Sequence, residues 1–141
     1  TSVQFPHCCH PIPGDDIIGY LGRDEGLQIH THDCAVVKRL HQKHPDQWAD
    51  VTWAPELERT FDVGIRVLMH TRNGALARIA ADVGRADSNV AHLAMDPDNG
   101  SGSSVLRLVL HVHDRIHLAN VLRVLRRNRD VIRVHRERGG A

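Results

Sequence analysis

One segment of the chain, between residues 61 and 69, has an apolar residue at every odd-numbered position and so constrains the fold most. These residues are Phe61, Val63, Ile65, Val67 and Met69. Successive side chains of a β-strand point to opposite faces of the sheet, so the pattern places five apolar side chains on one face. We therefore expect a strand inside a sheet, with one face covered by another layer.

The rest of the second half alternates between helical and strand patterns. The first helix is predicted from apolar residues at helical spacing, namely Leu76, Ile79, Ala80 and Val83. Three further strands are predicted from alternating or apolar runs, at residues 89–95, 105–112 and 131–136. A second helix is expected between the last two strands, with Asp114 as its N-cap.

The resulting order is strand, helix, strand, strand, helix, strand, which is typical of a ferredoxin-like βαββαβ domain. In this fold both helices cover one face of an antiparallel sheet. We expect the other face to be hidden by a partner sheet, a second copy or the N-terminal half, because Val105 and Val109 are apolar. The strand at 105–112 has no aromatic residue, which argues against base stacking on this sheet.

The first part of the chain is predicted to be a separate small module. Two short strands are expected at 16–21 and 27–30 around a turn at 22–26, with a third strand at 50–54. Between them we predict a helix at 35–44, which Asp33 caps and Pro45 ends. Proline and charged residues at 54–59 mark the boundary. The fold class is therefore α+β, with one module at 1–57 and a ferredoxin-like domain at 60–138.

Charge separates the two halves more clearly than the net charge of +1 suggests. Residues 1–60 carry five basic and nine acidic side chains, whereas residues 61–141 carry thirteen and eight. Eight arginines fall within 115–138, enough to attract phosphate, although a solvated basic helix face explains them equally well. The candidates for RNA contact are Arg123, Arg126, Arg127 and Arg129. No apolar run approaches the roughly 18 residues that cross a membrane.

The cysteines offer a possible metal site. Three cysteines cannot all pair within one chain, which indicates a reducing, cytoplasmic setting. Thiolate and imidazole are the ligands that tetrahedral zinc prefers, and the three-residue spacing of His30 and Cys34 fits the second half of such a site. Cys8 and Cys9 would supply the first half. Buried reduced thiols without metal fit the same pattern, and the rival ligands are His7, His10 and His32.

A second candidate site lies where the strand at 61–70 meets its helix. Gly74 lets the backbone approach a ligand closely, and the first N–H groups of the helix can accept a carboxylate. We expect Asn89 to lie beside this turn, where its amide can bond an amino or carboxylate group. A plain Asn-Gly turn explains the same residues.

Nothing in the sequence predicts catalysis. The serines lack a positioned base, no phosphate-binding P-loop is present, and the consecutive Asp15 and Asp16 would point to opposite faces of a strand. The chain begins Thr1-Ser2-Val3-Gln4, without a starting methionine, so we expect a piece of a longer protein that is itself not an enzyme.

Two stretches of the chain resemble a known family. The run of residues 8–20, which begins Cys8-Cys9-His10-Pro11, together with 26–30 and 33–34, resembles the conserved-cysteine, ribosome-intersubunit module of long RelA/SpoT alarmone enzymes. The second half resembles the ACT domain that ends those proteins. The resemblance implies the regulatory C-terminal region of a (p)ppGpp synthetase/hydrolase, with its catalytic domains before Thr1. It also matches four residues to a structural zinc site: Cys8, Cys9, His30 and Cys34.

The ACT resemblance implies a homodimeric sensor of a small amino acid, such as valine or isoleucine, that acts allosterically on the catalytic domains. The implied ligand contacts are Arg72, Asn73, Gly74, Ala75, Leu76, Asn89 and Val90. In the full-length protein the resemblance also implies contact with ribosomal RNA. Two other functions remain open at this point: a ribosome-docking or RNA-docking module, and a dimerisation unit without a ligand.

Overall fold

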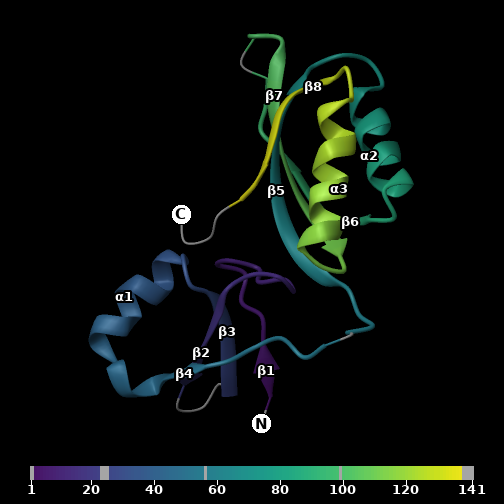
Figure 1. Ribbon diagram of the computed structural model, residues 1–141. Helices are drawn as coiled ribbons and strands as arrows, with labels where there is room; N and C mark the ends of the chain where they lie inside the picture. Colours follow the sequence, from purple (N-terminus) through teal and green to yellow (C-terminus); the bar gives the residue numbers. More distant parts are fainter. Residues whose placement is uncertain (1, 23–25, 56, 99, 138–141) are drawn as a thin grey trace.

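The computed structural model describes residues 2–22, 26–55, 57–98 and 100–137, which form two β-sheets, one in each half of the chain (Figure 1). The first sheet has the order β1-β3-β2-β4. Its strands are β1 (Val3–Gln4), β2 (Ile17–Gly22), β3 (Gly26–Thr31) and β4 (Trp48–Asp50). Helix α1 (Ala35–Lys43) and a short 3-10 helix, η1 (Pro45–Gln47), connect β3 to β4.

The predicted hairpin of the first module is confirmed, because β2 and β3 pair antiparallel. The expected turn at 22–26 falls largely outside the described residues. The third strand was wrongly expected at 50–54. It lies at Trp48–Asp50, because Trp48 pairs with Tyr20 and packs against its ring, with centroids 4.8 Å apart. Trp53 instead leaves the sheet and contacts the ring of Phe61 at the start of the second half.

The prediction that Asp33 caps α1 is also wrong. The N-cap is Cys34, and its side chain accepts no hydrogen bond from the helix. Its Sγ lies 3.6 Å from the Sγ of Cys8 instead, so the start of the helix is part of a thiol cluster.

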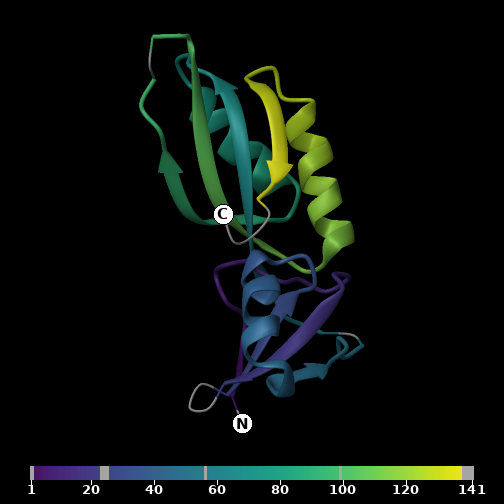
Figure 2. The same cartoon turned by 90° about the vertical axis from the view of Figure 1, so that its left-hand side faces the viewer.

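The second half confirms the ferredoxin-like prediction. Its elements are β5 (Phe61–His70), α2 (Ala75–Arg85), β6 (Asn89–Met95), β7 (Ser103–Val112), α3 (Arg115–Arg126) and β8 (Val131–Arg136). The strands form an antiparallel sheet in the order β6-β7-β5-β8, and both helices cover one face (Figures 1 and 2). Asp114 caps α3 as expected, since its Oδ1 accepts from the backbone N–H of His117 at 2.8 Å.

The core lies between this sheet and its two helices. The five alternating apolar side chains of β5 are all buried, at 3% exposure or less. Ile79 and Val83 of α2 pack against them and are also buried, whereas Ala80, which was expected in the same stripe, is exposed. No helix within the described ranges is long and apolar enough to cross a membrane.

The other face of the sheet is less apolar than expected. Val105 and Val109 are half-buried, but Arg107 lies between them on β7 and pairs with Arg66 on β5. The loop at residues 7–10 of the first module approaches one end of this face (Figure 1).

The two halves are joined by a buried ion pair. Arg136, at the end of β8, donates two hydrogen bonds of 2.7 Å to the carboxylate of Asp15, and one of 3.1 Å to the carbonyl of His10. Both charged side chains are less than 10% exposed. Ile12 of the same loop is fully buried in the core of the second half. The position of the first module is therefore fixed relative to the sheet.

Candidate functional site

The donor atoms of Cys8, Cys9, His30 and Cys34 all lie within 4.8 Å of one another. Cys8 and Cys9 come from the loop before β2, His30 from β3, and Cys34 from the N-cap of α1. Three segments of the first module thus meet at one point, and the structure brings together all four residues expected as metal ligands.

The distances within this cluster fit a tetrahedral metal ion. The Sγ atom of Cys8 lies 3.8 Å from that of Cys9 and 3.4 Å from Nδ1 of His30. With zinc–sulfur bonds of about 2.3 Å, the sulfurs of a tetrahedral site lie about 3.8 Å apart. The turn at residues 7–9 brings the two consecutive thiols to the same side of the chain. The cluster can therefore hold a metal ion.

The environment of the cluster favours the neutral ligands when no cation is bound. Burial, together with the neighbouring thiols, raises the pKa of the Cys8 thiol well above its usual range, and burial likewise raises the pKa of Cys9. Burial also lowers the pKa of His30, which keeps the imidazole neutral and able to donate its lone pair. A divalent cation offsets the cost of the thiolates, so binding would release protons.

Neighbouring groups orient the ligands. The Nε2 atom of His30 lies 3.3 Å from Oε1 of Gln28, a contact that leaves Nδ1 directed toward the thiols. The backbone N–H of Thr31 donates to the Sγ of Cys9 over 3.5 Å. The rival ligand His7 stacks on His10 instead, with ring centroids 5.2 Å apart. His32 lines a separate cavity beside Asp15 and Asp16.

Hydrogen bonds from Arg78 hold the turn at residues 72–76 in place. Gly74 is the N-cap of α2 and has a left-handed φ of +78°. The Arg78 guanidinium donates to the carbonyl of Asn73 at 3.0 Å and to both carboxylate oxygens of Asp130, at 2.6 and 3.1 Å. Arg72 lies 3.7 Å from the same carboxylate, which is fully buried. These hydrogen bonds from Arg78 hold the pKa of Asp130 below its usual range.

The structure does not bring Asn89 and Val90 to this turn, so that expectation is wrong for a single chain. Asn89 pairs with His111, which pairs with Asp62 at the start of β5, whereas the turn follows His70 at the end of β5. Strands β5 and β6 both run antiparallel to β7, so they start at the same end of the sheet. The two parts of the expected site are separated by the length of a ten-residue strand, about 30 Å.

The four arginines expected to contact RNA lie on α3 and in the loop that follows it. Arg123 and Arg126 lie on α3, and Arg127 and Arg129 follow in the loop before β8. All four are exposed. Helix α3 packs on the helical face of the sheet (Figure 1).

Sequence reasoning missed two ion pairs. The sequence pattern assigned no role to Asp130 and gave Asp15 only as half of a consecutive pair. Their partners, Arg78 and Arg136, lie 52 and 121 residues away in the sequence, so no local pattern could have connected them.

Comparisons with known proteins agree with both halves of this description. Residues 1–54 match the model of the RelA/SpoT RIS domain, and residues 57–136 match an ACT domain model. The bifunctional (p)ppGpp synthase/hydrolase SpoT of Escherichia coli K12 is 38% identical over 136 residues, which cover 96% of this chain and 19% of that protein. The GTP pyrophosphokinase of the same strain is 27% identical over 136 residues, with 96% and 18% covered.

Among solved structures, the ACT domain from the GTP pyrophosphokinase of Chlorobium tepidum aligns with a TM-score of 0.48 and 23% identity. It covers 55% of this chain and 99% of that one. This chain spans about a fifth of the length of the curated relatives that it matches.

Proposed function

Because this chain belongs to the RelA/SpoT family, as a RIS domain followed by an ACT domain, we propose that it is the regulatory part of a (p)ppGpp synthetase/hydrolase. We propose further that its ACT domain dimerises and senses a small amino acid, and that the bound state biases the catalytic domains. A ligand produces such a bias only through different affinities for the two arrangements of the protein.

One edge of the ACT sheet has no neighbouring strand among the described residues, and this open edge supports dimerisation. Strand β6 ends the sheet, and its Leu93 and Met95 side chains are each 42% exposed. An open edge strand is a template for pairing with a second chain. A two-fold axis that pairs β6 with its copy would join two four-stranded sheets into one and bury these side chains.

The same axis resolves the separation of the two expected contact regions. Antiparallel pairing brings Asn89 of one subunit opposite Met95 of the partner subunit, at the end of the sheet where the partner's turn at 72–76 lies. Each of two sites is then made of one turn and one Asn89 from the other chain. Asn89 is exposed in the single chain, so its side chain is accessible to a ligand and a second subunit.

The chemistry of the two regions suits an amino acid. The N-terminus of α2 at Gly74 attracts a carboxylate, and the amide oxygen of Asn89 can accept a hydrogen bond from the ligand ammonium. Leu76 and Val90 are half-buried and apolar, which favours a branched side chain such as that of valine or isoleucine.

Mixing two variants tests whether the site is shared between subunits. Asn73→Asp adds a negative charge at the start of α2 and repels a ligand carboxylate, whereas Asn89→Ala removes the amide. Each variant alone should lose valine binding in calorimetry. A one-to-one mixture that exchanges subunits should regain one intact site per heterodimer, or about a quarter of the wild-type capacity. Asn120→Ala, on the exposed face of α3, serves as the control.

Failure of the mixture to recover any binding, or full binding by either variant alone, would contradict the shared site. A monomer at all concentrations in analytical ultracentrifugation would contradict it as well.

We propose that the metal of the cysteine cluster is zinc in a structural role. The donor set of three thiols and one imidazole is one that zinc prefers. Cys8, Cys9, His30 and Cys34 would hold the ion, which would link the loop before β2 to β3 and α1. Such a site requires reduced thiols, which fits a protein of the cytoplasm.

A second candidate function is docking to ribosomal RNA, which the exposed Arg123, Arg126, Arg127 and Arg129 favour. Phosphate contacts make affinity fall steeply with salt, with a logarithmic slope of about −0.9 per neutralised phosphate on duplexes. We expect Arg126→Ala with Arg127→Ala to weaken binding to a ribosomal RNA fragment and to reduce that slope by about 2. An unchanged slope would exclude these residues from the contact.

A further inference from the structure

We propose that the cleft between the loop at residues 7–10 and the open face of the ACT sheet binds a diphosphate group, carried by a small molecule such as a nucleotide. The cleft is separate from the turn at 72–76 and from the arginines of α3. Its volume is about 420 Å³, within the range of about 300–1,000 Å³ that is typical of small-molecule sites.

The main observation is a row of three basic side chains, called here the basic row, across three adjacent strands. Arg66 on β5 pairs directly with Arg107 on β7 and, on its other side, with His135 on β8. Like charges directly opposite each other destabilise a sheet. Strands lie about 4.8 Å apart, so the row extends over about 10 Å. The facing arginines destabilise the sheet, and the row extends across three strands. Both features suit a ligand that carries more than one negative charge.

Among the described residues that line the cleft, a single acidic side chain, that of Glu137, offsets part of this charge. Oε1 of Glu137 lies 3.9 Å from Nε of Arg107, and both side chains are substantially exposed, at 40% and 51%. The backbone of Glu137 is fixed, because its N–H donates to the carbonyl of Gly64 at 2.9 Å. Glu137 therefore occupies the position of an anion beside Arg107 and would compete with a bound phosphate.

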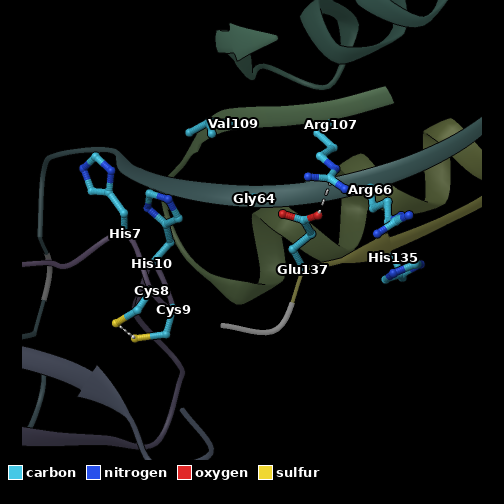
Figure 3. A pocket seen from close by; sticks show the side chains of 10 residues that line it. All are labelled: His7, Cys8, Cys9, His10, Gly64, Arg66, Arg107, Val109, His135 and Glu137. Atoms are coloured by element: carbon cyan, nitrogen blue, oxygen red, sulfur yellow. Dashed lines mark hydrogen bonds and ion pairs between the residues drawn. The ribbon is translucent and has the colours of Figure 1, made fainter. Parts of the chain in front are cut away.

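The shape of the cleft explains how a ligand would fit (Figure 3). Gly64 and Val109 contribute small or apolar surface next to the basic row. Gly64 also leaves the centre of the sheet without a side chain. His7 and His10 line the cleft from the opposite loop and are stacked on each other. Guanidinium groups bind phosphate oxygens through paired hydrogen bonds, and an imidazole face can stack on a nucleobase. A cleft of this size holds one nucleotide rather than an RNA helix.

The test is calorimetry on the zinc-loaded chain with GDP and with sodium pyrophosphate as probes. We expect saturable binding with one ligand per chain. Arg66→Ala and Arg107→Ala should each weaken it about fivefold to tenfold, whereas Glu137→Gln should strengthen it by removing the internal competitor. Arg126→Ala removes the same charge from the far side of the sheet and should change the affinity less than twofold.

The two probes distinguish the sources of the diphosphate. Tighter binding of GDP assigns the cleft to nucleotides and the histidine pair to the base, and equal affinities assign it to inorganic diphosphate. Several results would overturn the proposal. They are the absence of saturable binding by either probe, equal losses in Arg66→Ala and Arg126→Ala, weaker binding in Glu137→Gln, and displacement of GDP by decauridylate that binds more tightly through the same arginines.

Discussion

Removal of the Arg136 guanidinium tests how strongly the RIS domain is fixed to the ACT domain. In Arg136→Met the long apolar stem is retained, but three hydrogen bonds are lost, two to Asp15 and one to the carbonyl of His10. Arg136 and Asp15 are 9% and 6% exposed, so water replaces the missing partner poorly. Breaking one side of a buried ion pair typically costs about 3–5 kcal/mol.

The expected loss lies at the lower end of this range. Asp15 retains the backbone N–H of Ile12, which donates to Oδ2 at 2.9 Å, and Arg115, whose Nε lies 3.7 Å from Oδ1. We therefore expect unfolding to cost about 3 kcal/mol less in the variant. For a chain of this size that is a fall in Tm of about 10 °C.

Differential scanning calorimetry measures this change, with guanidinium unfolding as a second readout. Arg85→Met is the matched control, because Arg85 forms an exposed ion pair with Asp82 within α2 and should change stability by less than about 0.5 kcal/mol. A double-mutant cycle with Asp15→Asn should give a favourable coupling energy of about 1–3 kcal/mol. Equal effects of Arg136→Met and Arg85→Met, or no coupling energy, would refute a stabilising buried ion pair between the domains.

Three further outcomes are expected. Native mass spectrometry of the purified protein should detect one zinc ion per chain, and Cys34→Ser should lose it; equal zinc contents in variant and wild type would contradict the assigned ligand set. Asp130 has a pKa below that of the unfolded chain because Arg78 donates to it, so its contribution to stability is present above about pH 4 and is lost as the pH falls through the lower, folded value. Asp130→Asn should therefore be less stable than wild type at pH 7, and a difference that persists undiminished at pH 2 would contradict this. Gly74→Ala should destabilise by about 1–2 kcal/mol, because the residue has a positive φ and a new Cβ would lie 2.7 Å from the Arg78 guanidinium. Gly84→Ala, in open space on α2, should stabilise by about 0.5–1 kcal/mol, and the same sign at both glycines in denaturation curves would count against the described turn.

The sequence was most informative where a pattern repeats within one element. The alternation along β5 predicted both the strand and its buried face, because every second residue faces the helices. For the cysteine cluster, the spacing of His30 and Cys34 suggested a metal site but left rival ligands open, and the family resemblance supplied the set of four residues. The geometry of the cluster depends on how the loop at 7–10 returns to β3. The RelA/SpoT resemblance is confirmed by the two matching family models.

Long-range contacts could not be predicted from the sequence. The expected contact between Asn89 and the turn at Gly74 is an exception, because it conflicts with the ferredoxin-like fold that the same sequence predicts. In that fold β5 and β6 run in the same direction, so Asn89 and the turn lie at opposite ends of the sheet. The Asp15–Arg136 ion pair joins residues that lie 121 positions apart in the sequence. The basic row on the open face depends on strand register, which pairs Arg66 with both Arg107 and His135.

In the proposed shared site, one amino acid contacts two regions that lie at opposite ends of the sheet in each chain and meet only through two subunits. Titration of the isotope-labelled chain with valine, followed by amide and side-chain NMR, tests it most directly. We expect Gly74 and the Asn89 side-chain amide to shift together and to saturate at the same valine concentration, whereas Asn120 stays unchanged. Shifts at only one of the two regions, or at neither, would contradict it.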